Sequence, residues 1–197
     1  MSTDPLRGQA IDLFREWLEE ARQAQVAEPT AMILATADPD GRISARAVLL
    51  KDVDELGFCF YTNLGSIKAR QLDANPVAAC CFLWKPLYKQ VQVEGRIEPV
   101  AGAEADAYFA TRARGSQIGA WASKQSVPLE SRQYLEQRVA HFEKKFEGIE
   151  VPRPEFWSGY RVVPQMIEFW QGEKHRLHQR WRYEKGADGW SRTLLNP

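Results

Sequence analysis

The sequence predicts an α+β protein that is mainly β, built as an antiparallel barrel with peripheral helices. After a first helix, segments typical of β-strands come before and after a helical middle section of the 197-residue chain, and strand and helix seldom alternate. Hydrophobic residues make up 44% of the sequence and charged residues 26%, a composition typical of folded globular proteins. We therefore expect a single domain over residues 1–197, since a chain of this length can bury a substantial core.

The N-terminal segment, residues 1–28, is predicted to be a helix. Asp4 and Pro5 are residues typical of a helix start, and Pro29 follows its end. Apolar residues recur after this start at helical spacing, at Phe14, Trp17, Leu18 and Ala21. The helix is therefore expected to be amphipathic, with one face packed on the barrel.

Residues 31–97 are predicted to contain strands and one short helix. The run Asp38-Pro39-Asp40-Gly41 is a turn sequence that connects the first two strands as a hairpin. After the third strand, Ser66 offers an N-cap for a helix that ends before Pro76. Because helix N-termini attract anions, this junction is a candidate phosphate site. The predicted strands are residues 31–37, 43–51, 58–62, 77–84 and 88–97.

Residues 101–148 are predicted to be a helical insertion. Three helices are expected, from Ala103 to about Arg112, from Ser116 to Ala122, and from Ser131 to Glu147. The third carries an apolar stripe made by Leu135, Val139, Phe142 and Phe146. We expect these helices to cap the sheet.

The C-terminal segment, residues 160–197, is predicted to return to β-structure, with strands at 160–163, 166–171, 177–184 and 190–194. From Arg176 onward charged and uncharged residues alternate. In a strand this alternation would put Arg176, His178, Arg180 and Arg182 on one face. Such a face would attract anions; the alternative is a solvated edge strand whose charges prevent aggregation.

Charge and composition exclude several classes of function. Lysine plus arginine and aspartate plus glutamate number 26 each, so the chain has no overall field for a polyanion, and nucleic-acid binding through the strand at Arg180 to Arg182 is disfavoured. Three histidines and three cysteines, without a C-x-x-C pair, give no metal site. We find no apolar signal core and no run long enough to span a bilayer, and we expect a cytoplasmic protein with no membrane partner.

Four motifs in the same order identify a family resemblance. They are Arg46-x-Val-Leu-Leu-Lys51, Tyr61-Thr-Asn-x-x-Ser66-x-Lys68, Ser116-Gln-Ile-Gly-Ala-Trp-x-Ser-x-Gln125-Ser126 and Glu168-Phe-Trp-Gln-Gly-x-x-x-Arg176-Leu-His178-x-Arg180. Together they resemble the pyridoxine 5′-phosphate oxidase family, and the likeness runs from about Asp4 to Pro197. The resemblance implies an FMN-binding split β-barrel, Greek-key-like in topology, that forms a homodimer with FMN at the interface.

The resemblance also implies the site residues. The cofactor-binding set is Arg46, Ala47, Val48, Leu49, Leu50, Lys51, Tyr61, Thr62, Lys68, Gln90, Gln125, Ser126, Trp170 and Arg180, contributed by both subunits. The substrate-binding set is Lys51, Tyr108, Arg112, Ser116, Arg176, Leu177 and His178, of which Arg176 and His178 are implied to be catalytic. The phosphate would be held by Lys51, Tyr108, Arg112 and Ser116, the last three of which share one face if their helix is continuous.

Arg46 and Lys51 are an odd number of residues apart, so in an ideal strand they would face opposite ways. A bulge, or a division of labour between cofactor and substrate, is therefore expected. Two positions depart from the family pattern: Ile67 stands where an arginine is common, and Lys89 where an arginine usually precedes Gln90. We expect the missing cation at position 67 to weaken FMN binding.

The implied reaction is FMN-dependent oxidation of pyridoxine 5′-phosphate or pyridoxamine 5′-phosphate to pyridoxal 5′-phosphate, with molecular oxygen as acceptor and hydrogen peroxide as product. Arg176 and His178 would orient and polarise the substrate ring. Two alternatives remain: a split-barrel flavin oxidase of another substrate, of the phenazine-biosynthesis type, and a non-catalytic carrier of flavin or pyridoxal phosphate.

Overall fold

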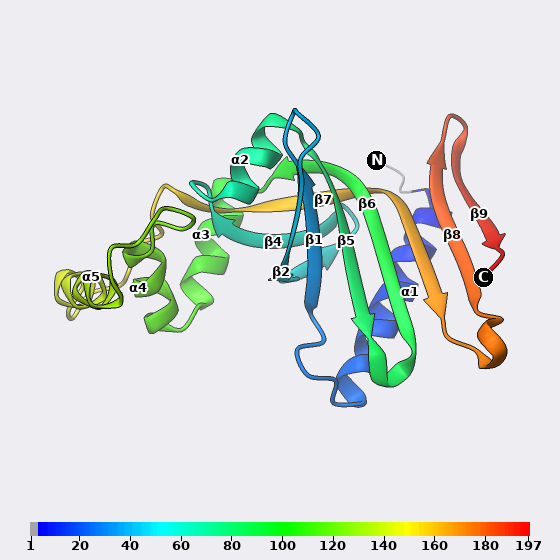
Figure 1. The fold of residues 1–197 in the computed structure, drawn as a ribbon, viewed down its shortest axis with the longest axis horizontal. Helices are drawn as coiled ribbons and strands as arrows, with labels where there is room; N and C mark the ends of the chain where they lie inside the picture. The colour runs from blue at the N-terminus through cyan, green and yellow to red at the C-terminus, as the bar shows by residue number, and fades with distance from the viewer. Residues whose placement is uncertain (1–3) are drawn as a thin grey trace.

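The computed structural model describes residues 4–197 and is organised around one curled antiparallel sheet (Figure 1). The strand order is β2-β1-β5-β6-β7-β4-β3, and β8 joins β7 to β9. The strands are β1 (Ala31–Ala37), β2 (Ile43–Leu49), β3 (Asp52–Asp54), β4 (Gly57–Asn63), β5 (Val77–Trp84), β6 (Lys89–Pro99), β7 (Trp157–Gln171), β8 (Gln179–Gly186) and β9 (Gly189–Leu195). The expected mainly-β α+β class with an antiparallel sheet is therefore confirmed.

Helix α1 (Pro5–Gln23) packs its apolar face into the curl of the sheet. Asp4 caps it, its Oδ1 accepting a hydrogen bond from the Leu6 amide at 3.0 Å. Phe14 is fully buried and lies edge-on to Phe58 and Phe82, with ring centroids 4.8 and 4.9 Å away. The predicted N-terminal helix thus extends over residues 5–23, while residues 1–3 of that prediction lie outside the described residues.

The prediction of two strands at 160–163 and 166–171 is wrong, because β7 runs through both. Proline interrupts the pattern at Pro164, but the pairing of β6 with β7 shifts register between Glu94 and Gly95, so Gln165 is the extra residue of a β-bulge. A bulge tolerates a residue that cannot donate to the ladder. A Cβ at Gly95 would come within 2.2 Å of the Val163 carbonyl oxygen, so the close approach of the two backbones requires glycine.

The helical insertion packs mainly on itself and on the first residues of β7 (Figure 1). It contains α3 (Gly102–Thr111), α4 (Arg114–Ala122) and α5 (Arg132–Lys145). Its separate core consists of Phe109, Ile118, Phe146, Val151 and Trp157. The expectation that it caps the sheet is met at that end and at α3, whose Ala105 is buried together with Cys59 of β4. None of the helices within residues 4–197 has the length and hydropathy needed to span a bilayer.

A continuous helix through Tyr108, Arg112 and Ser116 is not formed. Helix α3 ends at Thr111, and Arg112 has an extended ψ of 145°, so α4 begins as a new helix at Arg114. The condition under which the three side chains would share one helix face is therefore not met, and the two separate helices agree with the predicted ranges.

Candidate functional site

A cavity of about 550 Å³ opens between β2, β4, the start of α2 (Ile67–Ala74) and α4. Its wall combines cations, hydroxyls and amides with aromatic and aliphatic surface. The lining residues are Arg46, Ala47, Val48, Leu49, Lys51, Tyr61, Thr62, Asn63, Lys68, Arg112, Ser116, Gly119, Ala120, Ser123, Gln125 and Trp157. Segments that lie far apart in the sequence, including three of the four motifs, therefore meet at one cavity.

Arg46 projects from β2 and is held by neutral oxygen atoms. Its Nη1 donates to Thr36 Oγ1 at 2.6 Å and to the Leu34 carbonyl at 3.2 Å. Its Nη2 donates to Ser44 Oγ and, at 3.4 Å, to Gln71 Oε1. Burial lowers the pKa of Arg46, and within residues 4–197 this guanidinium forms no ion pair.

Lys68 enters the cavity from the first turn of α2. Ser66 caps this helix, its hydroxyl accepting from the Ala69 amide at 3.3 Å. Lys68 Nζ donates to Thr62 Oγ1 and to Gln125 Oε1, each at 3.2 Å. Burial lowers the pKa of Lys68, and the nearby charge of Arg46 lowers it further. Two cations thus share this end of the cavity, and no carboxylate among the described residues pairs with either.

Arg112 also lines the cavity, and its guanidinium stands over aromatic rings. Its guanidinium lies 4.6 Å from the Trp157 ring, and its Nη1 is buried without a hydrogen-bond partner among the described residues. Burial lowers the pKa of Arg112. The rings of Tyr61, Tyr108 and Trp157 are nearly parallel; the Tyr61 centroid lies 4.1 Å from that of Tyr108 and 5.3 Å from that of Trp157, and the last two are 6.2 Å apart. Burial raises the pKa of Tyr61.

These groups fit a ligand that carries an anionic group and a flat ring system. A phosphate needs cations and hydroxyls, which Arg46, Lys68 and Thr62 supply together, and the unpartnered Nη1 of Arg112 offers a further donor. A ring system needs aliphatic or aromatic walls, which Val48, Leu49 and Trp157 supply. The donor set and the apolar walls therefore fit the phosphate and the ring system of a flavin mononucleotide, and also those of a small phosphorylated substrate.

In an ideal strand Arg46 and Lys51 would face opposite sides, but β2 ends between them. The strand stops at Leu49, and the amide of Lys51 already donates to the Cys59 carbonyl of β4 at 2.8 Å. The chain has changed partners between the two cations, so both line the same cavity. Leu50, between them, is buried in the core instead.

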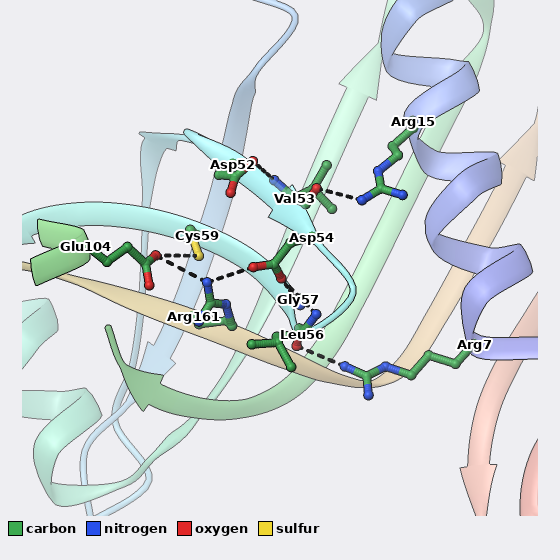
Figure 2. A network of polar contacts seen from close by, with 10 residues as sticks. All are labelled: Arg7, Arg15, Asp52, Val53, Asp54, Leu56, Gly57, Cys59, Glu104 and Arg161. Carbon is green, nitrogen blue, oxygen red and sulfur yellow. Dashed lines mark hydrogen bonds and ion pairs between the residues drawn. The ribbon is translucent and has the colours of Figure 1, made fainter. Parts of the chain in front are cut away.

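A second partly buried strand arginine, Arg161, has a different environment (Figure 2). Arg161 of β7 donates from Nη2 to Asp54 Oδ2 at 2.9 Å and to Glu104 Oε1 at 3.2 Å. The thiol of Cys59 also points at Glu104, with Sγ and Oε1 3.7 Å apart. Burial raises the pKa of Cys59 to about 12. This network ties β3 and α3 to β7.

The remaining candidate residues form a C-terminal cluster away from the cavity. Gln90 pairs with Trp170 across β6 and β7, and Trp170 pairs with Arg180 across β7 and β8. The His178 ring lies 4.6 Å from the Trp170 ring. The cluster lies at the end of the sheet that includes β8, whereas the cavity lies beside α2 and α4 (Figure 1). Its members are Gln90, Trp170, Arg176, Leu177, His178 and Arg180.

The prediction of one cationic strand face from Arg176 to Arg182 is wrong. Residues 174–176 form a 3₁₀ turn in which His175 and Arg176 have φ of 58° and 62°, and β8 begins only at Gln179. Arg180 and Arg182 both pair with the buried carboxylate of Glu168, at 2.7 and 2.9 Å. Burial alone would raise the pKa of Glu168, but the hydrogen bonds from the two arginines lower it. The single negative charge of Glu168 thus compensates one of the two positive charges.

Two other candidates contribute indirectly. Tyr108 does not line the cavity but stacks on the outer side of Tyr61. Ser126 lies next to Gln125, and its hydroxyl accepts from the Ile67 amide at 3.2 Å, at the start of α2. Both residues therefore support groups that do line the cavity.

Sequence reasoning missed Trp157 as a wall and Thr36, Ser44 and Gln71 as the groups that hold Arg46. A signal for the hydroxyls was present, because the turn at residues 38–41 puts Thr36 directly opposite Ser44 in the hairpin. No comparable signal pointed to Gln71, which comes from a different element. Trp157 opens β7, and its place depends on how the helical insertion folds back.

Comparisons with known proteins agree along nearly the whole chain. A family model described as pyridoxamine 5′-phosphate oxidase matches residues 18–146, and one described as pyridoxine 5′-phosphate oxidase C-terminal dimerisation region matches residues 157–197. A pyridoxine/pyridoxamine 5′-phosphate oxidase of Rubrobacter xylanophilus is 56% identical over 98% of this chain and 87% of its own length. That of Anaplasma phagocytophilum is 50% identical over 100% of this chain and 97% of its own.

Solved structures show the same architecture. PhzG from Burkholderia lata 383, in complex with tetrahydrophenazine-1-carboxylic acid, has a TM-score of 0.92 and 34% identity, covering 100% of this chain and 94% of that one. A pyridoxamine 5′-phosphate oxidase-related, FMN binding protein from Nostoc punctiforme has a TM-score of 0.74 and 17% identity, covering 93% of this chain and 97% of its own, and supports the fold alone. The split-barrel fold implied by the motifs is thus confirmed.

Proposed function

Because the chain belongs to the pyridoxamine 5′-phosphate oxidase family, we infer that it oxidises pyridoxine 5′-phosphate and pyridoxamine 5′-phosphate to pyridoxal 5′-phosphate. The alcohol substrate and oxygen give the aldehyde and hydrogen peroxide; the amine substrate, oxygen and water give the aldehyde, hydrogen peroxide and ammonia. The observation that carries this function is the 50–56% identity to relatives of that name over nearly the full chain. The cationic cavity agrees with it, since the substrates and the proposed cofactor carry phosphates.

The cofactor is a flavin, and FMN is the form that the cavity favours. Arg46, Lys68 and Thr62 form a cationic group that suits a single terminal phosphate. When bound, FMN accepts two electrons from the substrate carbon being oxidised and passes them to oxygen. The protein contributes the placement of the two reactants and the exclusion of water between them.

The substrate phosphate is assigned to Lys51, Arg112 and Ser116, which line the same cavity as Lys68. Each charge-assisted hydrogen bond contributes about 1.5–3 kcal/mol, so a few such bonds offset a large part of the roughly 4–15 kcal/mol cost of immobilising a ligand. The phosphate thus anchors the substrate. Tyr61, held by stacking on Tyr108, makes this part of the cavity wall rigid.

The chain forms a homodimer, in keeping with the dimerisation region at residues 157–197. The outer face of the sheet exposes large apolar residues, among them Ile33 at 48% and Leu83 at 59%, which a partner would cover. A two-fold interface would place the C-terminal cluster of one chain at the cavity of the other. We assign FMN to this interface, with Gln90, Trp170 and Arg180 contributed by the partner.

Arg176 and His178 then orient the substrate ring. The Glu173 amide donates to His178 Nδ1 at 3.1 Å, so the neutral imidazole carries its proton on Nε2 and can donate it to a ring substituent. Arg176→Ala should lower turnover at least tenfold while the bound flavin remains, because Arg176 is assigned to the substrate ring and not to the flavin. Unchanged turnover would remove this role.

The visible spectrum of the purified protein tests the function. A flavin spectrum that bleaches on anaerobic addition of pyridoxine 5′-phosphate, and recovers in air, is the expected result. A flavin that stays oxidised with either vitamer but bleaches with a reduced phenazine precursor would favour the activity suggested by the likeness to PhzG. A flavin that no substrate reduces would indicate a carrier. We place the enzyme in the cytoplasm, where its three free cysteines would stay reduced.

A further inference from the structure

We propose that Gln71 is a positioning residue that aims Arg46 at the phosphate of the flavin while leaving its charge uncompensated. This inference rests on the proposed function, since it concerns how the cavity recognises FMN. Gln71 does not line the cavity and belongs to none of the motifs that identify the family.

Gln71 lies on α2, one turn after Lys68, and is 8% exposed. Its Oε1 accepts from Thr36 Oγ1 at 2.5 Å, from Ser44 Oγ at 2.8 Å and from Arg46 Nη2 at 3.4 Å. One oxygen atom thus collects hydrogen bonds from β1, from two residues of β2 and from no charged group other than Arg46. Because a guanidinium only donates, the side-chain atom next to it must be the oxygen of the amide.

The proton arrangement follows from the same inventory of donors. The hydroxyls of Thr36 and Ser44 each accept a hydrogen bond from Arg46 and each have one proton. That proton goes to Gln71, so the lone pairs of both hydroxyls face the guanidinium. Gln71 therefore fixes two hydroxyls that in turn fix Arg46, and hydrogen bonds linked in this way strengthen one another.

Because the Gln71 amide is neutral, it leaves the positive charge of Arg46 uncompensated. A carboxylate in the place of Gln71 would hold Arg46 in the same position but would cancel its charge, as Asp54 and Glu104 do for Arg161. An amide holds the guanidinium without competing with a dianionic phosphate. The cation is thus rigid before the ligand arrives, which reduces the entropy cost of binding.

Gln71 has a role in the site that is separable from the docking of α2. The helix is attached to the sheet by the buried Ala69 and Leu72 and by a hydrogen bond from the Tyr160 hydroxyl to Asp73 at 2.8 Å. Asp73→Asn is therefore a matched control, because it alters a side-chain contact of the same helix without touching Arg46.

The experiment measures the affinities of the dimeric apoprotein for FMN and for riboflavin, which lacks the phosphate, by quenching of flavin fluorescence. In Gln71→Met we expect about a tenfold loss of FMN affinity, because Arg46 is no longer held in position for its hydrogen bond to the FMN phosphate. Riboflavin affinity should stay unchanged within twofold. In Gln71→Glu we expect a larger loss of FMN affinity than in Gln71→Met, again without a loss of riboflavin affinity, although glutamate keeps the shape of the side chain and its acceptor oxygen. Asp73→Asn should keep the wild-type ratio of the two affinities.

Thermal unfolding of each variant shows whether it is folded. If Gln71→Met does not fold, Thr36→Val and Ser44→Ala each remove one of the linked hydroxyls and should show the same selective loss of FMN affinity. Equal weakening of FMN and riboflavin in the Gln71 variants, or a Gln71→Glu protein that binds FMN like the wild type, would overturn the inference alone. A wild-type protein that does not prefer FMN to riboflavin would overturn the proposed function and this inference with it.

Discussion

Arg46 and Arg161 are both partly buried strand arginines, but their surroundings give them opposite roles. Arg161 pairs with Asp54 and Glu104 (Figure 2), whereas Arg46 is held by hydroxyl, amide and carbonyl oxygens. Burial lowers the pKa of both, but for Arg161 the charges of Cys59, Asp54 and Glu104 outweigh it and the net shift is upward. A compensated cation stabilises the fold, while an uncompensated one beside a cavity remains available to a ligand.

Arg161→Met should give the largest loss of stability. It leaves Asp54 and Glu104 without their cation. Removing one partner of a fully buried pair costs about 3–5 kcal/mol, and we expect about 2 kcal/mol here because both carboxylates are partly exposed to solvent. Urea unfolding would measure the free energy. Arg132→Met is the control, since its pair with Glu136 is exposed and should cost under about 0.5 kcal/mol. A loss as small as the control's would contradict the structural role of Arg161.

Arg46→Met should have the opposite effect to Arg161→Met, with a large loss of FMN affinity and a small change in stability. The hydroxyls of Thr36 and Ser44 still donate to Gln71 without Arg46, so we expect a stability change below about 1 kcal/mol. The affinity for FMN should fall by roughly 10- to 100-fold, the equivalent of one charge-assisted contact. Calorimetric titration with FMN, beside urea unfolding of the same samples, checks both expectations. An Arg46→Met protein that is much less stable than the wild type but keeps its FMN affinity would show that Arg46, like Arg161, stabilises the fold.

In the C-terminal part of the sheet, the carboxylate of Glu168 forms ion pairs with both Arg180 and Arg182. The folded-state pKa of Glu168 is below its unfolded value, so its stabilisation is present above the unfolded pKa and is lost as pH falls through the folded pKa. We expect the free energy of unfolding to drop below about pH 4.5, by about 1 kcal/mol after solvent screening. In Glu168→Gln that part of the drop should be missing. Identical pH profiles of the two proteins would argue against the pairing.

Ile67→Arg should produce the smallest effect and the only gain. Ile67 is 48% exposed at the start of α2, one residue before Lys68. A cation there would add a partly screened charge near the proposed phosphate, which corresponds to roughly a threefold gain in FMN affinity. Ile67→Gln, with similar length and no charge, should bind FMN like the wild type. Equal affinities for the arginine and glutamine variants would show that position 67 does not reach the phosphate.

Much of the fold could be predicted because its signals are local. The helix over residues 5–23, the hairpin of β1 and β2, and the cap at Ser66 follow from spacing and turn chemistry within a few residues. The errors occur where tertiary contacts override local patterns. Pro164 suggested a strand break, but pairing with β6 absorbed it as a bulge, and the alternation from Arg176 suggested a strand where the chain turns.

The sequence by itself determined the family, the chemistry of the cofactor and most of the residues that line the cavity, because these reside in short motifs. Only the tertiary structure decided which cations are free to bind a ligand. Arg161 finds its carboxylates 107 and 57 residues away, and Gln71 reaches Arg46 across 25 residues. Charge compensation depends on distance in space, and a linear pattern does not record which oppositely charged groups the fold brings within a few ångströms.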